Sequence, residues 1–475
     1  MNKTAVKARP KSGQSSSAHA NSSAVKHRLN GRDDQVHGKA LRQHTPRSSH
    51  AQWSPPTNRR DPIKILVDSS AHRVQHLVPI RYGRMLQSPF AFYRGAAAIM
   101  SADLSHTPVT GLKVQVCGDC HLMNFGIFAT PERRLIFDIN DFDESLPGPW
   151  EWDLKRLATS FVIAGRHNAF KRGQARDVAL ACAQSYRQQM DRFSQMRALD
   201  VWYERIDVED LLENLPEKSF RKQAEADIRK ASHGGTEHDF PKLVDLEKGK
   251  PQIRDNPPLI YHPRHAEARD FIEDLKQAFH CYRKTLPDER RVLVDRYVLT
   301  DHAVKVVGVG SVGTRCGILL LMAGPGDPLF LQVKEATASV LEPYLGKSHY
   351  DNHGERVVIG QRLMQAASDI CLGWTYGRGG RHFYIRQLHD VKVKPMVEVY
   401  DPPTMSVYAN YCGWVLARAH ARSGDAKLIS EYLGGSDRFD QSLANFAEAY
   451  ADQNEKDFKE FVGAVRKRRL HAVVE

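Results

Sequence analysis

The amino-acid sequence predicts an α+β protein with two lobes, preceded by a disordered N-terminal tail. Apolar residues recur every three or four positions in 178–193 and again in 271–282, as one buried face of a helix requires. Short apolar runs joined by Gly, Pro and Asp turns fill residues 300–400, a pattern typical of strands. Residues 1–60 are polar and almost free of apolar clusters, so they cannot bury enough surface to fold.

The rest of the chain divides by the same patterns. We expect a mostly helical lobe at 61–300, a strand-rich lobe at 301–400 and C-terminal helices at 401–475. Residues 202–260 are charged and weakly periodic, which predicts an insertion or a loose helical subdomain.

Length and hydropathy place the chain among proteins with a sizeable core. It has 475 residues, of which 41% are hydrophobic, enough for two or three domains or one large two-lobed domain. No stretch approaches eighteen consecutive apolar residues, and the basic N-terminus lacks the apolar region of a secretory signal. We therefore expect a cytoplasmic protein without a membrane span.

The net charge of +12 belongs mainly to the tail. Residues 1–60 hold twelve Lys and Arg against Asp33 and Asp34, so the remaining chain carries only about +2. A nearly neutral fold argues against nucleic acid as the main partner, apart from weak contact through the tail.

Seven scattered cysteines predict free thiols in a reducing compartment. Cys117 and Cys120 form one CxxC pair without a second pair to accompany it. A zinc or redox site there stays open, but we favour two thiols that flank a more important residue, Asp119.

The densest candidate chemistry lies in two acidic segments, 118–126 and 137–144. The first carries Asp119 and Asn124, and the second contains Asp138 and Asp141. Phosphoryl transfer needs a carboxylate near the attacking hydroxyl and hard oxygen ligands that hold Mg²⁺ against the phosphates. A calcium-binding or plain acidic surface loop is the alternative interpretation.

These segments resemble the catalytic core of kinase-like phosphotransferases such as aminoglycoside and choline kinases. The form G-D-x-H-x-x-N is matched from Gly118 to Asn124, and Trp152-Asp153-Leu154 stands where those relatives carry a bracing Asp-Leu pair. The resemblance implies that Asp119 is the catalytic base, that Asn124 and Asp138 bind the metal, and that Asp153 is structural. Asp141 or Asp143 is then a second ligand. Cys117 departs from the pattern, since those kinases usually carry His before the glycine.

Residues 308–313 match G-x-G-x-x-G, and the segment after them decides between the two main uses of that pattern. A dinucleotide site would continue into a helix, whereas here the chain continues as a strand, a Gly/Pro/Asp turn and a second strand ending at Lys334. This order is typical of a kinase glycine-rich loop. We expect Gly308, Gly310, Ser311 and Gly313 to contact the nucleotide, together with Lys334 as a catalytic residue that binds phosphate. Glu355, on the predicted helix 355–367, is the favoured carboxylate partner of that lysine. A plain hairpin turn is the alternative interpretation of the glycines.

The two motif sets appear in reverse order, because the catalytic loop precedes the glycine loop by roughly 190 residues. We therefore expect a circularly permuted protein-kinase-like fold. From residue 61 onward the chain is also similar to an uncharacterised bacterial family, domain of unknown function 2252. Its recurring segments include GDxHxxNFG, FDxNDFDE, GxGSxGxR, QVKEA and the late run 417–425. That late run is expected to contact substrate, to offset the acidic cluster or simply to end a helix.

The leading hypothesis is an Mg²⁺-dependent phosphotransferase that uses ATP on an unknown hydroxyl acceptor. Transfer of AMP on the same fold is the runner-up, and a non-catalytic nucleotide-binding module is a third interpretation. The sequence identifies neither the acceptor nor the oligomeric state.

Overall fold

The computed structural model describes residues 37–474, except for 215–220, 223–224, 227, 230–239, 241–242, 248, 263–265, 307, 309 and 389–391. Residues 38–475 group into one compact unit by their contacts. The architecture is α+β, as the sequence predicts. A circularly permuted kinase-like arrangement stays a prediction.

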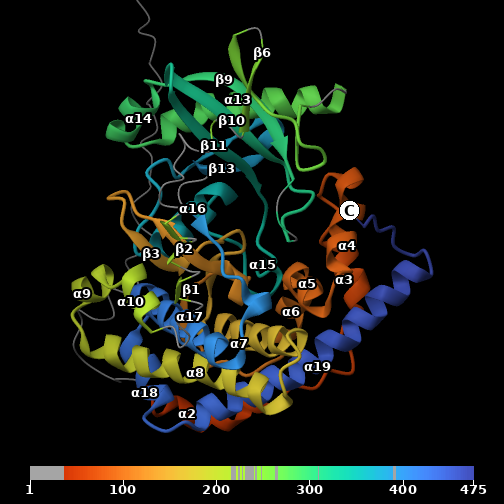
Figure 1. The fold of residues 1–475 in the computed structure, drawn as a ribbon. Helices are drawn as coiled ribbons and strands as arrows, with labels where there is room; N and C mark the ends of the chain where they lie inside the picture. The colour runs from red at the N-terminus through yellow and green to blue at the C-terminus, as the bar shows by residue number, and fades with distance from the viewer. Residues whose placement is uncertain are drawn as a thin grey trace, which may run out of the picture. The chain divides into compact units, whose positions relative to one another are not determined.

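A six-stranded antiparallel sheet forms the strand-rich part of the chain (Figure 1). Its order is β12-β13-β11-β10-β9-β8, and every neighbouring pair is antiparallel. The strands are β8 (Ile260–Tyr261), β9 (Val298–Lys305), β10 (Cys316–Gly324), β11 (Asp327–Ala336), β12 (Gly373–Tyr376) and β13 (His382–Gln387). The predicted order of strand, glycine loop, strand, turn and strand is thus confirmed for β9, β10 and β11.

Both faces of this sheet are covered. Leu319 and Leu321 of β10 pack with α13 (Ala266–Thr285), whereas Ile318 and Leu320 pack with the hairpin β6 (Val244–Glu247) and β7 (Lys250–Ile253). Successive residues of a strand face opposite sides of the sheet. A continuous apolar run therefore gives a strand that is buried on both faces. The helices α14 (Asp288–Val294), α15 (Glu342–Leu345) and α16 (His353–Met364) complete this region.

A smaller sheet lies beneath, between α16 and the helical core (Figure 1). Its order is β14-β2-β3-β5, and β1 pairs separately with β4. The strands are β1 (Lys113–Val116), β2 (Phe125–Ala129), β3 (Leu135–Ile139), β4 (Leu146–Pro149), β5 (Ile206–Asp207) and β14 (Lys392–Val393).

The helical core combines segments from both ends of the chain. It is built from α7 (Trp150–His167), α8 (Arg172–Gln195), α17 (Pro402–Ser423), α18 (Ala426–Leu433) and α19 (Arg438–Arg466). Trp150 of α7, Tyr186 of α8 and Phe439 of α19 meet in it, with the rings of Trp150 and Tyr186 stacked at 5.7 Å. The expected C-terminal part 401–475 therefore shares its core with the preceding lobe.

Shorter elements surround this core. They are α2 (Leu41–His44), η1 (Arg47–Ala51), α3 (Pro62–Asp68), η2 (Gln75–Leu77), α4 (Val78–Met85), α5 (Pro89–Gly95), α6 (Ala97–Leu104), η3 (Leu122–Asn124), α9 (Ala198–Tyr203), α10 (Val208–Glu213), η4 (Arg378–Gly380) and η5 (Val397–Val399). Among the helices in the described ranges, none combines the length and apolarity needed to cross a bilayer.

Residues 38–60, which the sequence predicts as part of a disordered tail, pack on the rest of the compact unit and include α2 and η1. The guanidinium of Arg59 forms ion pairs with Asp103 at 2.7 Å and with Asp457 at 2.6 Å. Composition misses this anchor because it is polar, and a search for apolar clusters does not detect it. Residues 1–36 of the predicted tail lie outside the described part of the chain.

The segment 202–260 contributes to two parts of the fold. Its described residues include α10 and the β6–β7 hairpin, whose Val244 and Ile253 pack on the six-stranded sheet. Much of 215–248 lies outside the described residues, so the loose helical subdomain stays a prediction.

Candidate functional site

The loop at 117–124 joins β1 to β2 and is braced by α7. The side chain of Asp153 accepts hydrogen bonds from the backbone N–H groups of Cys117 at 2.7 Å and Gly118 at 2.9 Å. Gly118 has φ +81°, and a Cβ there would collide with the backbone of Glu144, so this position requires glycine. Asp153 thus occupies the bracing position expected from the sequence.

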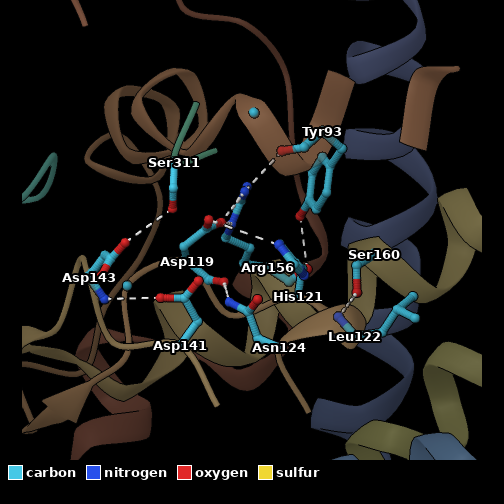
Figure 2. Close-up of polar contacts among 12 residues, drawn as sticks. Tyr93, Asp119, His121, Leu122, Asn124, Asp141, Asp143, Arg156, Ser160 and Ser311 are labelled. Carbon is cyan, nitrogen blue, oxygen red and sulfur yellow. Dashed lines mark hydrogen bonds and ion pairs between the residues drawn. The ribbon is translucent and has the colours of Figure 1, made fainter. Parts of the chain in front are cut away.

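Further hydrogen bonds fix the second half of the loop. The Ser160 hydroxyl accepts from Leu122 N–H at 3.0 Å, and the Tyr408 hydroxyl donates to Leu122 C=O at 2.6 Å. The Asn124 amide donates to the backbone carbonyl of Asp119 (Figure 2). Because Nδ2 is used in this way, the amide oxygen of Asn124 is left for another ligand.

Asp119 lies at the centre of the site (Figure 2). Its Oδ1 accepts from Arg156 Nε at 2.8 Å and also from Arg156 Nη2, and its Oδ2 is 4.0 Å from His121 Nε2. Burial raises the pKa of Asp119 to about 7, against the opposing effect of Arg156. Burial also lowers the pKa of His121 well below its ordinary value, so this imidazole is neutral.

Asp138 and Asp141 have different surroundings, although the sequence offers both as metal ligands. Asp138 is fully buried on β3, where Arg418 Nη2 donates to its two oxygens at 2.8 and 2.9 Å and Ala366 N–H donates at 2.8 Å. Asp138 is not among the residues that line the cavity, whereas Asp141 is. The structure therefore brings Asp141 to Asp119 and Asn124, and leaves Asp138 in an internal ion pair.

The strand lysine Lys334 lies on β11 and pairs with Asp143. Its ammonium donates to Asp143 Oδ2, and the Tyr384 hydroxyl donates to Asp143 Oδ1 at 2.6 Å. Burial opposes the charge on Lys334, but Asp143 dominates among the remaining effects and the pKa of the lysine lies well above its ordinary value. Burial likewise opposes ionisation of Asp143, yet Lys334 and Tyr384 bring the pKa of this carboxyl below its ordinary value.

Glu355 is the predicted residue that the structure does not bring to this lysine. It lies half-exposed at the start of α16, and the charged groups near it are Asp351 and His349. Asn352 caps this helix by accepting from Gly354 and Glu355 N–H, and the carboxylate beside Lys334 comes from Asp143 instead. Sequence spacing on the helix does not reveal which face of α16 meets the sheet.

The glycine loop 308–313 lies over the acidic segments. The Ser311 hydroxyl donates to Asp143 Oδ2 at 3.3 Å (Figure 2), and Gly310 lies beside Asp119. Gly308 and Gly313 have φ of +66° and +89°, a backbone region that favours glycine. A dinucleotide-binding site would continue as a helix after the last glycine. Among the described residues no helix follows Gly313, and the chain continues into β10.

The loop is also held from outside, by residues that no sequence motif marks. Arg73 Nη1 donates to Val312 C=O at 2.6 Å and Val74 N–H donates to Gly313 C=O at 2.7 Å. Arg84 Nη1 donates to Gly308 C=O at 2.7 Å. The segment before α5 thus fixes both ends of the glycine loop.

These elements enclose a cavity of about 280 Å³. Its lining includes six of the residues predicted for the site: Asp119, Asn124, Asp141, Gly308, Gly310 and Ser311. It also includes three arginines that sequence reasoning missed: Arg73, Arg81 and Arg94. No motif marks these arginines: Arg73 lies in a bend before η2, Arg81 in α4 and Arg94 in α5.

The two cysteines of the CxxC pair belong to this loop but are not among the residues that line the cavity. Cys117, Cys120 and Asp153 place one ligand atom each within 4.8 Å of one another, and all three are buried. Both carboxylate oxygens of Asp153 already accept backbone N–H groups, and burial raises the pKa of both thiols. This environment favours two protonated thiols packed beneath Asp119.

The run 417–425 supports the site from behind. Arg418 neutralises Asp138, and His420 Nδ1 lies 2.8 Å from the Tyr186 hydroxyl. Arg422 stacks over the Trp202 ring at 3.9 Å, and Asp425 caps α18. The sequence leaves three interpretations of this run open. One of them applies to Arg418, whose charge offsets that of the acidic cluster.

Comparison with known proteins identifies the family. Residues 73–464 match the model of an uncharacterised protein family conserved in bacteria, DUF2252, and the chain belongs to this family. No curated protein and no solved structure matched the chain, so these comparisons lend no support to the kinase-like resemblance.

Proposed function

We propose that this DUF2252 protein is an Mg²⁺-dependent, ATP-using phosphotransferase with a circularly permuted, kinase-like arrangement. One observation carries the proposal: Asp119, Asn124 and Asp141 line the same cavity as Gly308, Gly310 and Ser311 of the glycine loop. The two motif sets are about 190 residues apart in sequence. If one set were accidental, nothing would bring both to one cavity.

The order of elements supports the permutation. The chain runs through β9, the glycine loop, β10, β11 with Lys334, α16, β12 and β13, and then enters α17. Kinases continue from the equivalent point to their catalytic loop, which here precedes this series at 117–124. The helix α17 packs on α7 and α8, so the ends of the permuted segments meet in one core.

Asp119 would serve as the base. Arg156 holds Oδ1, which orients the carboxylate and leaves Oδ2 on the side of Gly310. A hydroxyl of the acceptor that reached Oδ2 could pass its proton there while its oxygen attacks the terminal phosphorus, the bond to the bridging oxygen breaks and ADP leaves. The braced loop contributes by keeping this carboxylate in one orientation.

Asn124 and Asp141 would hold Mg²⁺. Their oxygens are the hard ligands that this ion prefers, and the amide orientation of Asn124 leaves its oxygen free of the Asp119 contact. Asp141 has no cationic partner among the described residues, which fits a carboxylate that awaits a metal. When bound, the ion would neutralise phosphate charge and align the transferring group.

Lys334 and the glycine loop would bind the phosphates. Lys334 is 3% exposed and is not itself among the residues that line the cavity, but its pairing with Asp143, which does line it, fixes its ammonium close to the acidic segments. In kinases a helix glutamate performs this pairing, and here Asp143 would take that part in place of Glu355. Backbone N–H groups of the glycine loop would supply further donors to phosphate oxygens.

Thermal unfolding with ATP, with Mg²⁺ and with both tests the proposal. A ligand at about 100 times its dissociation constant stabilises by about 2.7 kcal/mol, which should raise the midpoint by several degrees. We expect this shift to need both components in the wild type, to vanish in Asp141→Asn and to persist in Asp288→Asn. Asp288 is a matched aspartate whose side chain is 88% exposed on α14. A folded wild type that no nucleotide stabilises would contradict the proposal.

The group transferred needs its own experiment. Label on the γ-phosphate of ATP should appear in product if phosphate is transferred, whereas label on the α-phosphate would appear if AMP is transferred. Binding without transfer of either label, across a broad set of hydroxylated acceptors, would favour a non-catalytic module.

A further inference from the structure

One wall of the cavity is cationic. Arg73, Arg81 and Arg94 come from the segment 68–98 and face a lining that also holds the acidic residues of the site. The proposed phosphotransferase mechanism uses none of their guanidinium groups. Among the described residues, no carboxylate lies within ion-pairing distance of any of the three.

Arg94 is the arginine with the fewest partners. Its guanidinium lies 6.0 Å from the centroid of the Phe90 ring and makes no hydrogen bond to a described residue, and its Nε is buried without a partner. The carboxylates that act on it are Asp119, Glu398 and Asp141, of which Asp119 is the strongest. Arg94 therefore carries a free guanidinium on the side of the proposed base.

Arg81 lies behind Arg94, and its charge also has no ion-pair partner among the described residues. It is 3% exposed, and its two terminal nitrogens donate to neutral oxygens, the Ser70 hydroxyl and Gly95 C=O, each at 2.8 Å. Its Nε is buried and has no partner among the described residues. Burial lowers the pKa of both Arg81 and Arg94, and Asp119 and the other nearby charges offset this effect only in part.

The carboxylates that line the cavity do not neutralise this wall, because most of them already have a partner and Asp141 is the proposed metal ligand. Asp119 is bound by Arg156, Asp143 by Lys334, and Glu335 by Arg315 at 3.2 Å. A buried guanidinium without a counter-ion is costly, and its planar donors match the oxygens of phosphate and carboxylate groups. An anion from outside the protein would satisfy these donors.

We propose that the acceptor substrate carries a phosphate or carboxylate group, which Arg94 binds with Arg81 behind it. This inference rests on the proposed phosphotransferase function. The nucleotide phosphates have their own partners in Lys334, the backbone N–H groups of the glycine loop and the proposed Mg²⁺. Arg94 instead lies near Asp119, where the acceptor hydroxyl must sit, so its anion belongs to the acceptor. The substrate class is a small hydroxylated molecule that is already anionic.

Isothermal titration with simple anions tests the inference on the intact protein. The nucleotide site is first saturated with Mg²⁺ and a non-hydrolysable ATP analogue, and inorganic phosphate or acetate is then titrated. We expect wild type to bind one of the two anions, and Arg94→Met to weaken that binding at least tenfold while the analogue binds within about twofold of wild type. Arg94→Lys should recover part of the affinity, because it restores the charge without the fork of donors. Phosphate or acetate binding distinguishes the two possible groups.

Arg172→Met is the matched control, since it removes an arginine whose side chain is 82% exposed on α8. Its anion affinity should equal that of wild type. The inference is overturned if neither anion binds wild type, if Arg94→Met binds them equally well, or if Arg94→Met weakens the ATP analogue as much as the anion. Failure of the analogue to bind wild type, with Arg94-dependent anion binding retained, would instead refute the phosphotransferase and leave an anion site.

Discussion

Replacing Asp138 should destabilise the fold, and this loss of stability should not depend on metal binding. Asp138 is fully buried and accepts two hydrogen bonds from Arg418, which is 1% exposed, and one from Ala366 N–H. In Asp138→Asn an amide NH₂ group replaces one acceptor and points at these donors, and Arg418 keeps a buried charge without a partner. Breaking a buried pair from one side costs about 3–5 kcal/mol.

Urea unfolding followed by circular dichroism measures this cost. An independently folding unit commonly has about 5–15 kcal/mol of stability, so a loss of this size should lower the midpoint visibly. Asp141→Asn is the matched control, because it changes the same residue type three positions later without breaking an ion pair. We expect it to keep the stability of wild type within about 0.5 kcal/mol.

A double-mutant cycle identifies the cause. Arg418→Met should also destabilise, and the double variant Asp138→Asn with Arg418→Met should lose less than the two single changes together. The reasoning is refuted if Asp138→Asn unfolds at the wild-type urea concentration yet no longer responds to Mg²⁺ with ATP. That result would make Asp138 the metal ligand, as the sequence first indicated.

Two further predictions concern the glycine loop and the sheet. Gly313→Ala should cost about 1–2 kcal/mol, because φ is +89° and the new Cβ would lie 3.0 Å from Arg73 Cβ. Gly324→Ala, which meets open space, should be near neutral, and equal urea midpoints for the two variants would disprove the conformational argument. The pKa of His262 is raised to about 9, first by its hydrogen bond to Asp301, so the protonated imidazole stabilises the fold below pH 6.5 and this contribution disappears as pH rises through 9. Allowing for solvent screening, wild type should lose about 1 kcal/mol more than His262→Gln between pH 6 and pH 10, and parallel stability curves would contradict this.

The sequence alone determined the local parts of the candidate site. Gly118, Asp119 and Asn124 stand in one short loop, so their spacing already restricts how they can lie. The resemblance to kinase-like phosphotransferases implied that Asp153 braces that loop, and its two backbone hydrogen bonds agree. Helical and strand periodicity located α8, α13 and the three strands around the glycine loop, because one-sided or two-sided burial leaves a direct trace in the order of apolar residues.

Only the tertiary structure decided which charges meet. Asp138 and Asp141 are the same residue type and cannot be told apart in the sequence. Because β3 ends at Ile139, Asp138 stays inside the sheet while Asp141 reaches the cavity. The partner of Asp138 is Arg418, 280 positions away along the chain, and that of Lys334 is Asp143, 191 positions away. Such pairs leave no periodic signal, because Coulomb attraction depends on distance in space and not on spacing in sequence. Sequence reasoning missed the arginines of the cavity wall for the same reason.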